Sequence, residues 1–306
     1  MRAVVRWAAV AQALFVVFLW SVSKIIAKMG LADIPPYTLA ALAQVVALAG
    51  LSIYAMWNRR EHNFNLSGED VYLAMLIGLV GYVGANLFVM IGLQYVTGAT
   101  GGLIAATSSV FTVIISALVL KERPALLQYA GIAVIALGSY VFLTNQVITG
   151  SAIGVGLLLT AELAFAFSDS LVRMVNKKYD ESVALPIALI ANVVGVLVLV
   201  PLSIVADGIP KIVWHWQLVF WVVAIGLILG FGNLLWTGVL NRLRLIEAVV
   251  ISNTMLIQVA LFAVVFLGER LAPNNFTGGA LVLVGAVITD GHLLLPSWFK
   301  MKGATE

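Results

Sequence analysis

The chain has 306 residues, of which 62% are hydrophobic and 10% are charged, and its net charge is +3. Soluble domains carry about a quarter charged residues, so this composition excludes an ordinary soluble protein and predicts one that crosses the membrane several times. The absence of cysteine excludes disulfides, thiolate metal sites and cysteine nucleophiles. No dense basic segment is present, so we expect no nucleic-acid partner.

The first apolar segment covers residues 7–29 and follows Arg2 and Arg6. A signal peptide has an apolar region of roughly 7–15 residues and then a cleavage site with small residues. This segment is longer than that. We therefore expect it to be the first membrane-spanning helix, retained in the mature protein.

Turn and charge clusters divide the whole chain into ten apolar segments, each near the roughly 20 residues that a spanning helix needs. The sequence predicts helices over residues 7–29, 37–57, 71–93, 98–120, 126–145, 152–176, 184–206, 216–240, 246–268 and 275–295. No break between them is long enough for a soluble domain. The expected fold is an all-α integral membrane protein with ten transmembrane helices.

Lys and Arg are distributed unequally between the two sides that this topology defines. The side of the N-terminus collects 13 of the 17, and the other side has Lys24, Lys28, Lys211 and Arg270. Cytoplasmic loops carry the excess of positive residues. We therefore expect a multi-pass protein of the cytoplasmic (inner) membrane with both termini in the cytoplasm.

A repeat with a fixed offset of 147 residues runs through the chain. Residues that differ by this offset are called repeat mates below, and the informative pairs are Ser21/Ser168, Ser23/Ser170, Asn86/Asn233, Glu122/Glu269, Arg123/Arg270, Gly131/Gly278 and Gly138/Gly285. We interpret residues 1–147 and 148–306 as two copies of a five-helix unit. Because five is odd, the two copies must cross the membrane in opposite directions, which is the inverted-repeat plan of many secondary transporters.

The Glu-Arg pairs at Glu122-Arg123 and Glu269-Arg270 end the fourth and ninth helices, at opposite membrane faces. A charged pair there can mark the interface and cap the following turn, or it can form and break as a gate. An interfacial pair is partly hydrated and stabilises only weakly.

Several motifs together resemble a known family. Trp20-Ser21 in the first helix, "LKER" and "LGER" at the ends of the fourth and ninth, and the Gly131/Gly138 spacing are similar to the twin EamA repeat of the drug/metabolite transporter superfamily. Within it the chain looks most like the branch that exports aromatic and other neutral amino acids (the YddG type). The resemblance implies a central cavity lined by helices one, three, four, six, eight and nine, peripheral helices five and ten, and alternating access by rocking of the two halves.

The chain departs from this family at two positions. Ser109 and Leu256 stand where the family often has proline in the fourth and ninth helices. The departure makes a broken or kinked fourth helix doubtful.

Polar residues within the spans should face the interior of the bundle, because a polar group in hydrocarbon is costly. The candidates are Thr107 and Ser108 in the fourth helix, Asn253 and Gln258 in the ninth, and the repeat mates Asn86 and Asn233. Each can line the cavity or can simply bond a neighbouring helix. Asn86 and Asn233 can also act as hydrogen-bonded gates at mirrored depths.

Glu162 and Asp169 are seven residues apart on the sixth helix and share a face. Arg173 follows Asp169 at i+4, so we expect these two to pair structurally. Glu162 has no partner on its own helix, and it can bind a substrate ammonium or carry a proton, or it can be a neutral, hydrogen-bonded carboxyl. Lys24 can snorkel outward or attract a carboxylate.

The remaining cavity candidates are Ser21 and the aromatic residues Trp20, Phe88, Phe111, Phe165 and Trp236. Aromatic walls with a few polar groups suit a small molecule such as a neutral or aromatic amino acid. The alternative is an exporter of lipophilic cationic drugs, with proton antiport one possible mechanism. A zinc-enzyme motif is absent, and the three histidines fall at or outside the span ends. We therefore expect a transporter that is not an enzyme, has no cofactor or metal, and has lipid and a small-molecule substrate as partners.

Overall fold

A computed structural model describes residues 2–58, 64–106, 108–120, 126–143, 152–179, 181–270 and 272–294, and within them it contains helices and connecting turns but no strand. The first half consists of α1 (Arg2–Gly30), α2 (Pro36–Asn58), α3 (Gly68–Ile77), the π-helix η2 (Gly78–Ala85), α4 (Asn86–Tyr95), α5 (Gly98–Ala106), α6 (Ser108–Ile115), the π-helix η3 (Ser116–Leu120) and α7 (Leu126–Leu143). The second half consists of α8 (Ala152–Lys178), the short η4 (Glu181–Val183), α9 (Ala184–Ala206), α10 (Trp216–Arg242), α11 (Leu245–Ser252), α12 (Met255–Leu267) and α13 (Pro273–Leu294).

These elements lie within a few residues of the ten predicted spans, and the predicted fold class is confirmed. Seven of the spans are helices long and apolar enough to cross a membrane over the described residues. The third span runs without a break from α3 through η2 into α4. The Asp70 backbone amide bonds the Ser67 hydroxyl at 3.2 Å, which caps the start of this span.

The ninth span is broken between α11 and α12, although no proline stands there. The Thr254 amide donates to the Ile251 carbonyl and the Leu256 amide to the Asn253 carbonyl, each at 3.1 Å. These three-residue bonds tighten the chain into a turn at Asn253 and Thr254. In the fourth span, α5 and α6 lie on either side of residue 107, and Thr107 itself lies outside the described residues.

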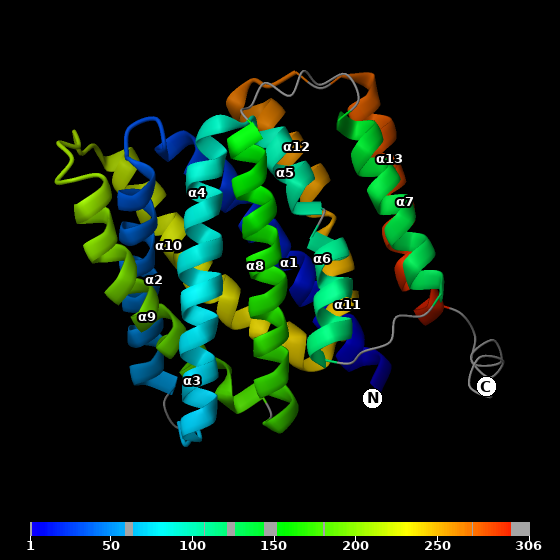
Figure 1. Cartoon of the computed structure of the whole chain (residues 1–306), viewed down its shortest axis with the longest axis horizontal. Coiled ribbons are helices and arrows are strands. Elements are labelled where there is room, and N and C mark those ends of the chain that lie inside the picture. The colour runs from blue at the N-terminus through cyan, green and yellow to red at the C-terminus, as the bar shows by residue number, and fades with distance from the viewer. Residues whose placement is uncertain are drawn as a thin grey trace.

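The two halves have opposite directions. In Figure 1, α1 ascends from the N-terminus at the lower edge, whereas α8 descends from the upper edge. Each later helix of the second half is likewise antiparallel to its counterpart, and α13 descends to end near the level where α1 begins. The start of α1 and the end of α13 therefore lie at the same end of the bundle, as an inverted duplication requires.

The last helices of the two halves, α7 and α13, pack on each other at one side of the bundle (Figure 1). A Cβ at Gly278 would lie 2.6 Å from the Gly138 carbonyl oxygen, and one at Gly285 would lie 2.7 Å from that of Gly131. Only glycine permits this approach of two helix backbones. The helices predicted to be peripheral thus form a separate antiparallel pair, and their glycines contact one another crosswise.

The second helices of the two halves also contact each other. The Gln44 amide of α2 donates to the Asn192 side-chain oxygen of α9 at 2.7 Å, in a buried position. Nearby, a Cβ at Gly78 would lie 2.7 Å from the Ala191 backbone, so Gly78 permits η2 to contact α9 closely. Gly78 therefore serves the packing of the two helices.

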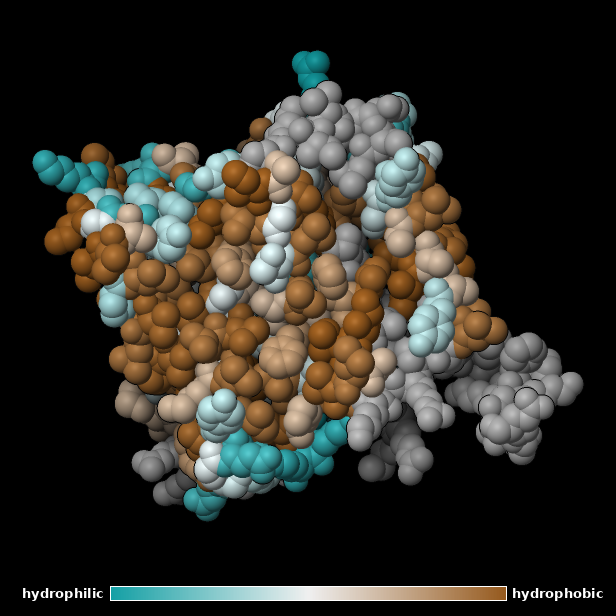
Figure 2. Space-filling model, viewed as in Figure 1, coloured by the Kyte–Doolittle hydropathy of each residue, from teal (hydrophilic) through white to brown (hydrophobic). Residues whose placement is uncertain are grey.

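The surface carries an apolar band between two polar ends. Figure 2 shows this band across the middle of one face, with hydrophilic residues above and below it. Large apolar side chains are exposed on several helices, including Ile53 and Trp57 of α2 and Leu197 and Val205 of α9. At the lower end, Lys178 contacts Asp70 at 2.9 Å and Glu69 at 3.3 Å. An apolar band of this kind suits contact with lipid.

Glu269 caps a helix of the other repeat. Its carboxylate accepts hydrogen bonds from the backbone amides of Gly98 at 2.8 Å and Ala99 at 3.1 Å, at the start of α5. Arg270 is exposed. Glu269 therefore caps the N-terminus of α5, a distant helix, whereas the sequence suggests a cap on the following turn. Glu122 and Arg123 lie outside the described residues.

Cationic side chains donate hydrogen bonds to the backbone carbonyls at the end of the third span of each repeat. Lys28 of α1 donates to the carbonyls of Leu93 and Val96 at the end of α4. Arg173 of α8 donates to the carbonyls of Leu240 and Leu243 at the end of α10. The second pair of carbonyls are the repeat mates of the first pair. Each repeat therefore neutralises its own exposed carbonyls with a cation from its own first helix.

Candidate substrate cavity

A cavity lies between the two repeats and encloses about 1130 Å³ of empty space, including the part that opens to solvent. Many of the residues that line it are repeat mates of one another: Tyr82 and Leu229, Asn86 and Asn233, Val89 and Trp236, Met90 and Thr237, Ala105 and Ser252, and Ser108 and Met255. Equivalent positions of both halves therefore face the same space.

An ion pair connects the first helices of the two repeats at the cavity. The Lys24 ammonium on α1 lies 3.7 Å from the Glu162 carboxylate on α8, and their side chains are 17% and 7% exposed. This distance exceeds that of a normal N–H···O hydrogen bond. The two groups balance each other in charge, and neither is held in the geometry of a tight pair.

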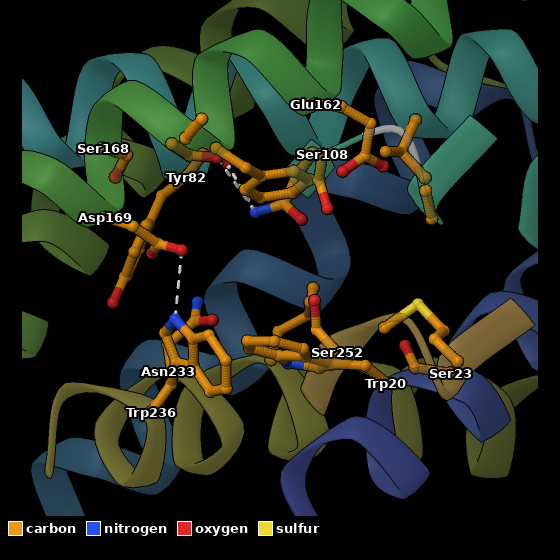
Figure 3. A pocket seen from close by; sticks show the side chains of 18 of the residues that line it. Trp20, Ser23, Tyr82, Ser108, Glu162, Ser168, Asp169, Asn233, Trp236 and Ser252 are labelled. Carbon is orange, nitrogen blue, oxygen red and sulfur yellow. Dashed lines mark hydrogen bonds between the residues drawn. The ribbon is translucent and has the colours of Figure 1, made fainter. Parts of the chain in front are cut away.

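Asp169 carries a second carboxylate into the cavity from the same helix. The Trp236 indole nitrogen donates to it at 3.1 Å (Figure 3). We expected Asp169 to pair with Arg173, but the Arg173 guanidinium donates to carbonyls at the end of α10. A long side chain close to a helix end reaches the exposed carbonyls of the neighbouring helix, and the carboxylate one turn back points into the cavity instead.

Two tryptophans that the sequence places deep in the membrane form one wall. The rings of Trp20 and Trp236 lie with centroids 5.1 Å apart and an interplanar angle of 58°. A Cβ at Gly232 would lie 2.9 Å from the Trp20 indole nitrogen, so this glycine leaves room for the ring. Phe165 of α8 also lines the cavity. The aromatic faces offer stacking and cation–π contact to a bound molecule.

The π-helix η2 shapes the wall that the third span contributes. A π-helix leaves backbone carbonyls without their usual partners. The Asn86 side-chain amide supplies a donor to two of them, at 3.2 Å from the Tyr82 oxygen and 3.4 Å from the Gly81 oxygen. A Cβ at Gly81 would lie 2.3 Å from the Ser168 hydroxyl, so the widened turn packs directly on α8. Asn86 therefore stabilises the segment that carries Tyr82 into the cavity.

The structure brings part of the predicted site together and places the rest elsewhere. The residues at the cavity are Trp20, Asn86, Ser108, Glu162, Phe165, Asp169, Asn233 and Trp236. Five other described candidates, Ser21, Phe88, Phe111, Asn253 and Gln258, are not among its lining residues.

Physical reasons account for most of these displacements. The single proton of the Ser21 hydroxyl is within hydrogen-bond reach of the Val17 carbonyl at 2.8 Å and of the Gln258 side-chain oxygen at 3.0 Å, so Ser21 and Gln258 join α1 to α12. Phe88 packs against the apolar cluster around Leu158 of α8. Asn253 is completely buried at the break of the ninth span. Side chains in these places bond or fill gaps between helices.

Sequence reasoning also missed residues that line the cavity, among them Ser23, Tyr82, Ser168 and Thr237. Two features of the sequence point to two of these residues, Ser168 and Tyr82. Ser168 is the repeat mate of Ser21, and Tyr82 precedes Asn86 by four residues, so it shares that helix face. A tyrosine within a span otherwise resembles the interfacial aromatic residues, which conceals its inward position.

Comparisons with known proteins agree with this architecture. The model of the EamA-like transporter family matches twice, over residues 7–144 and 152–289. An uncharacterized transporter of Bacillus subtilis, YoaV, is 21% identical over 88% of this chain and 92% of its own length. A probable amino-acid metabolite efflux pump of Salmonella typhimurium is 26% identical over 90% of this chain and 92% of its own, and its Escherichia coli counterpart is 24% identical over the same shares.

A solved crystal structure shares the fold. It superposes with a TM-score of 0.73, covers 94% of this chain and 99% of its own, and is 20% identical in sequence. The two family matches fall one on each half of the chain, on either side of the α7–α8 connection. The chain therefore belongs to the EamA-like transporter family.

Proposed function

We propose that the chain is a secondary transporter that exports amino acids, neutral and aromatic ones among them, across the cytoplasmic membrane. The observation that carries this proposal is the combination of groups in one cavity. A loosely held Lys24–Glu162 pair at 3.7 Å offers opposite charges for a zwitterion, and the Trp20–Trp236 wall accepts a side chain. The names of the Salmonella and Escherichia relatives as amino-acid metabolite efflux pumps support the same class.

Binding of a zwitterion would exchange one ion pair for two. The substrate carboxylate would approach Lys24 and its ammonium would approach Glu162, so each buried charge keeps a partner of opposite sign. A substrate that lacks either group would leave one of the two buried charges without a partner. Such a substrate binds poorly, because breaking a buried ion pair without replacement is costly. This requirement favours amino acids over amines or carboxylic acids alone.

The inverted repeats supply the means of transport. Equivalent positions of both halves line the cavity, and we infer that rocking of the two halves exposes it alternately to each side of the membrane. The cations Lys177, Lys178, Arg242 and Arg244 gather at the end where α1 begins. By the positive-inside rule we propose that this end faces the cytoplasm.

Counterflow in proteoliposomes tests the function. Purified protein would be reconstituted with an unlabelled amino acid inside and a labelled one outside, and a panel of twenty amino acids would compete. We expect several neutral and aromatic ones to exchange, and the matching amine and carboxylic acid of one of them not to compete. If no amino acid competes, the proposal is wrong.

A second candidate function is export of lipophilic cations, which is favoured by the two carboxylates and one lysine among the described residues that line the cavity. Aromatic faces and an excess carboxylate would both attract a hydrophobic ammonium. The same counterflow assay separates the two functions. Competition by a quaternary ammonium dye in the absence of competition by amino acids would favour this second candidate.

A further inference from the structure

We infer that Asp169 is a separate cation subsite, which gives the cavity a preference for amino acids whose side chains end in a positive charge. This inference rests on the proposed function, because it assigns a second subsite in the same cavity. It differs from the amino-acid head-group site at Lys24 and Glu162. The two carboxylates, Glu162 and Asp169, lie seven residues apart on one face of α8.

The charges that line the cavity do not balance. Among the residues that the structure describes, its charged lining residues are Lys24, Glu162 and Asp169, so one cation faces two carboxylates. Lys24 lies 3.7 Å from Glu162, which leaves the Asp169 carboxylate as the excess charge. A monocationic substrate with three charged groups, such as lysine, complements this set group for group. A neutral amino acid leaves Asp169 without a counter-charge.

The polar groups around Asp169 come from several helices, and among the described residues they are neutral or negative. The Trp236 indole of α10 donates to it at 3.1 Å, Tyr82 of η2 lies at the same end of the cavity, and Glu162 is the other acid of its own helix. Arg173, one turn further along α8, donates to backbone carbonyls of α10. One indole N–H leaves most of the acceptor capacity of a carboxylate unused.

The spacing fits a bifunctional ligand. Glu162 and Asp169 are seven residues apart on α8, which corresponds to about 10 Å along the helix axis and places both on one face. In Figure 3 they appear apart along the cavity, with Glu162 beside Ser108 and Asp169 beside Tyr82. An extended lysine side chain carries four methylene groups between its Cα and its ammonium. Its apolar stem would pass the Trp20–Trp236 wall, and its ammonium would approach Asp169.

The test compares lysine with norleucine, which has the same four-carbon side chain and lacks only the terminal ammonium. In counterflow by the wild-type protein we expect lysine to compete about ten- to a hundredfold better than norleucine, as a charge-assisted hydrogen bond allows. Asp169→Asn should abolish this advantage, because it should weaken lysine exchange much more than norleucine exchange. Asp169→Glu, which keeps the charge, should retain part of the advantage.

Two controls separate the subsite from a structural role. Trp236→Phe removes the indole donor and keeps the carboxylate, so the lysine-to-norleucine ratio should persist. Glu162→Gln should weaken both amino acids alike, because it removes the site of the shared α-ammonium. If the wild-type protein exchanges norleucine and lysine equally well, the proposed subsite is wrong and the amino-acid function still stands. The same conclusion follows from an Asp169→Asn variant that loses both alike. A protein that exchanges no amino acid refutes the proposed function instead.

Discussion

A Cβ atom added to Gly278 of α13 would lie 2.6 Å from the carbonyl oxygen of Gly138 on α7. Real Cβ atoms do not approach so closely, so the two helices are in backbone contact at this point. The repeat mate of Gly278 is Gly131, and the repeat mate of Gly138 is Gly285. These two mates make the equivalent contact, because a Cβ at Gly285 would lie 2.7 Å from the Gly131 carbonyl oxygen. The last helix of each repeat is therefore bound to its own counterpart.

Gly278→Ala should destabilise the protein, because the backbone of α7 cannot move aside without separating the pair. Overpacking of this kind typically costs about 1–3 kcal/mol. The thermal unfolding midpoint in detergent measures it. Gly156→Ala in α8 is the matched control, since a Cβ there meets nothing within 4 Å. A midpoint for Gly278→Ala equal to that of the control would contradict the close contact.

The Lys24–Glu162 pair should show strong coupling in a double-mutant cycle. Lys24→Met and Glu162→Gln should each destabilise by about 1–3 kcal/mol, because each leaves a buried group without its partner. The double variant should recover part of that loss, since it removes both members. Unfolding midpoints of the four proteins give the coupling. Additive losses would show that the two side chains do not interact.

Glu269→Ala should weaken the start of α5. The carboxylate accepts from two backbone amides there, and loss of a cap costs about 0.5–2 kcal/mol. Hydrogen exchange at Gly98 and Ala99 should accelerate, which localises the effect. Arg270→Ala is the control, because its exposed side chain should contribute little. Equal effects of the two substitutions would instead favour an Arg–Glu pair as the stabilising unit.

The proposed orientation is testable because the native chain has no cysteine. A membrane-impermeant maleimide added to intact cells should label Lys211→Cys, in the α9–α10 connection, and should label Lys177→Cys, at the end of α8, only after permeabilisation. Both positions are exposed. The reverse pattern would place the α1 start outside the cytoplasm.

The apolar segments and the repeat were sufficient to predict the ten helices and their opposite directions. Segment length and the odd helix count are coarse properties, and both survive small errors in the helix ends. The sequence could not predict the π-helix over Gly78–Ala85 or the break at Asn253. The sequence pattern of a single span carries no information on the packing of its neighbours, such as the contact of Gly78 with Ala191.

The predicted cavity lining agrees with the structure for residues that are costly to bury in a membrane, and differs from it for residues that neighbouring helices satisfy easily. Glu162 and Trp236 were identified because a mid-span carboxyl or indole needs a reason to be there. Ser21 and Gln258 were misplaced because a hydroxyl and an amide satisfy each other across two helices as readily as they face a cavity. The Lys24–Glu162 contact joins helices far apart in sequence, and periodicity along a single helix carries no information on it.

The symmetry of the cavity wall is interrupted at its charged residues. The repeat mates of Lys24, Glu162 and Asp169 are Leu171, Phe15 and Val22, none of which is ionisable. A scaffold with equivalent halves has no intrinsic sense of inward and outward, because a half-turn about its axis exchanges the two. Any difference between the inward-open and outward-open states must therefore originate in such unmatched positions, and the three charged residues are among them.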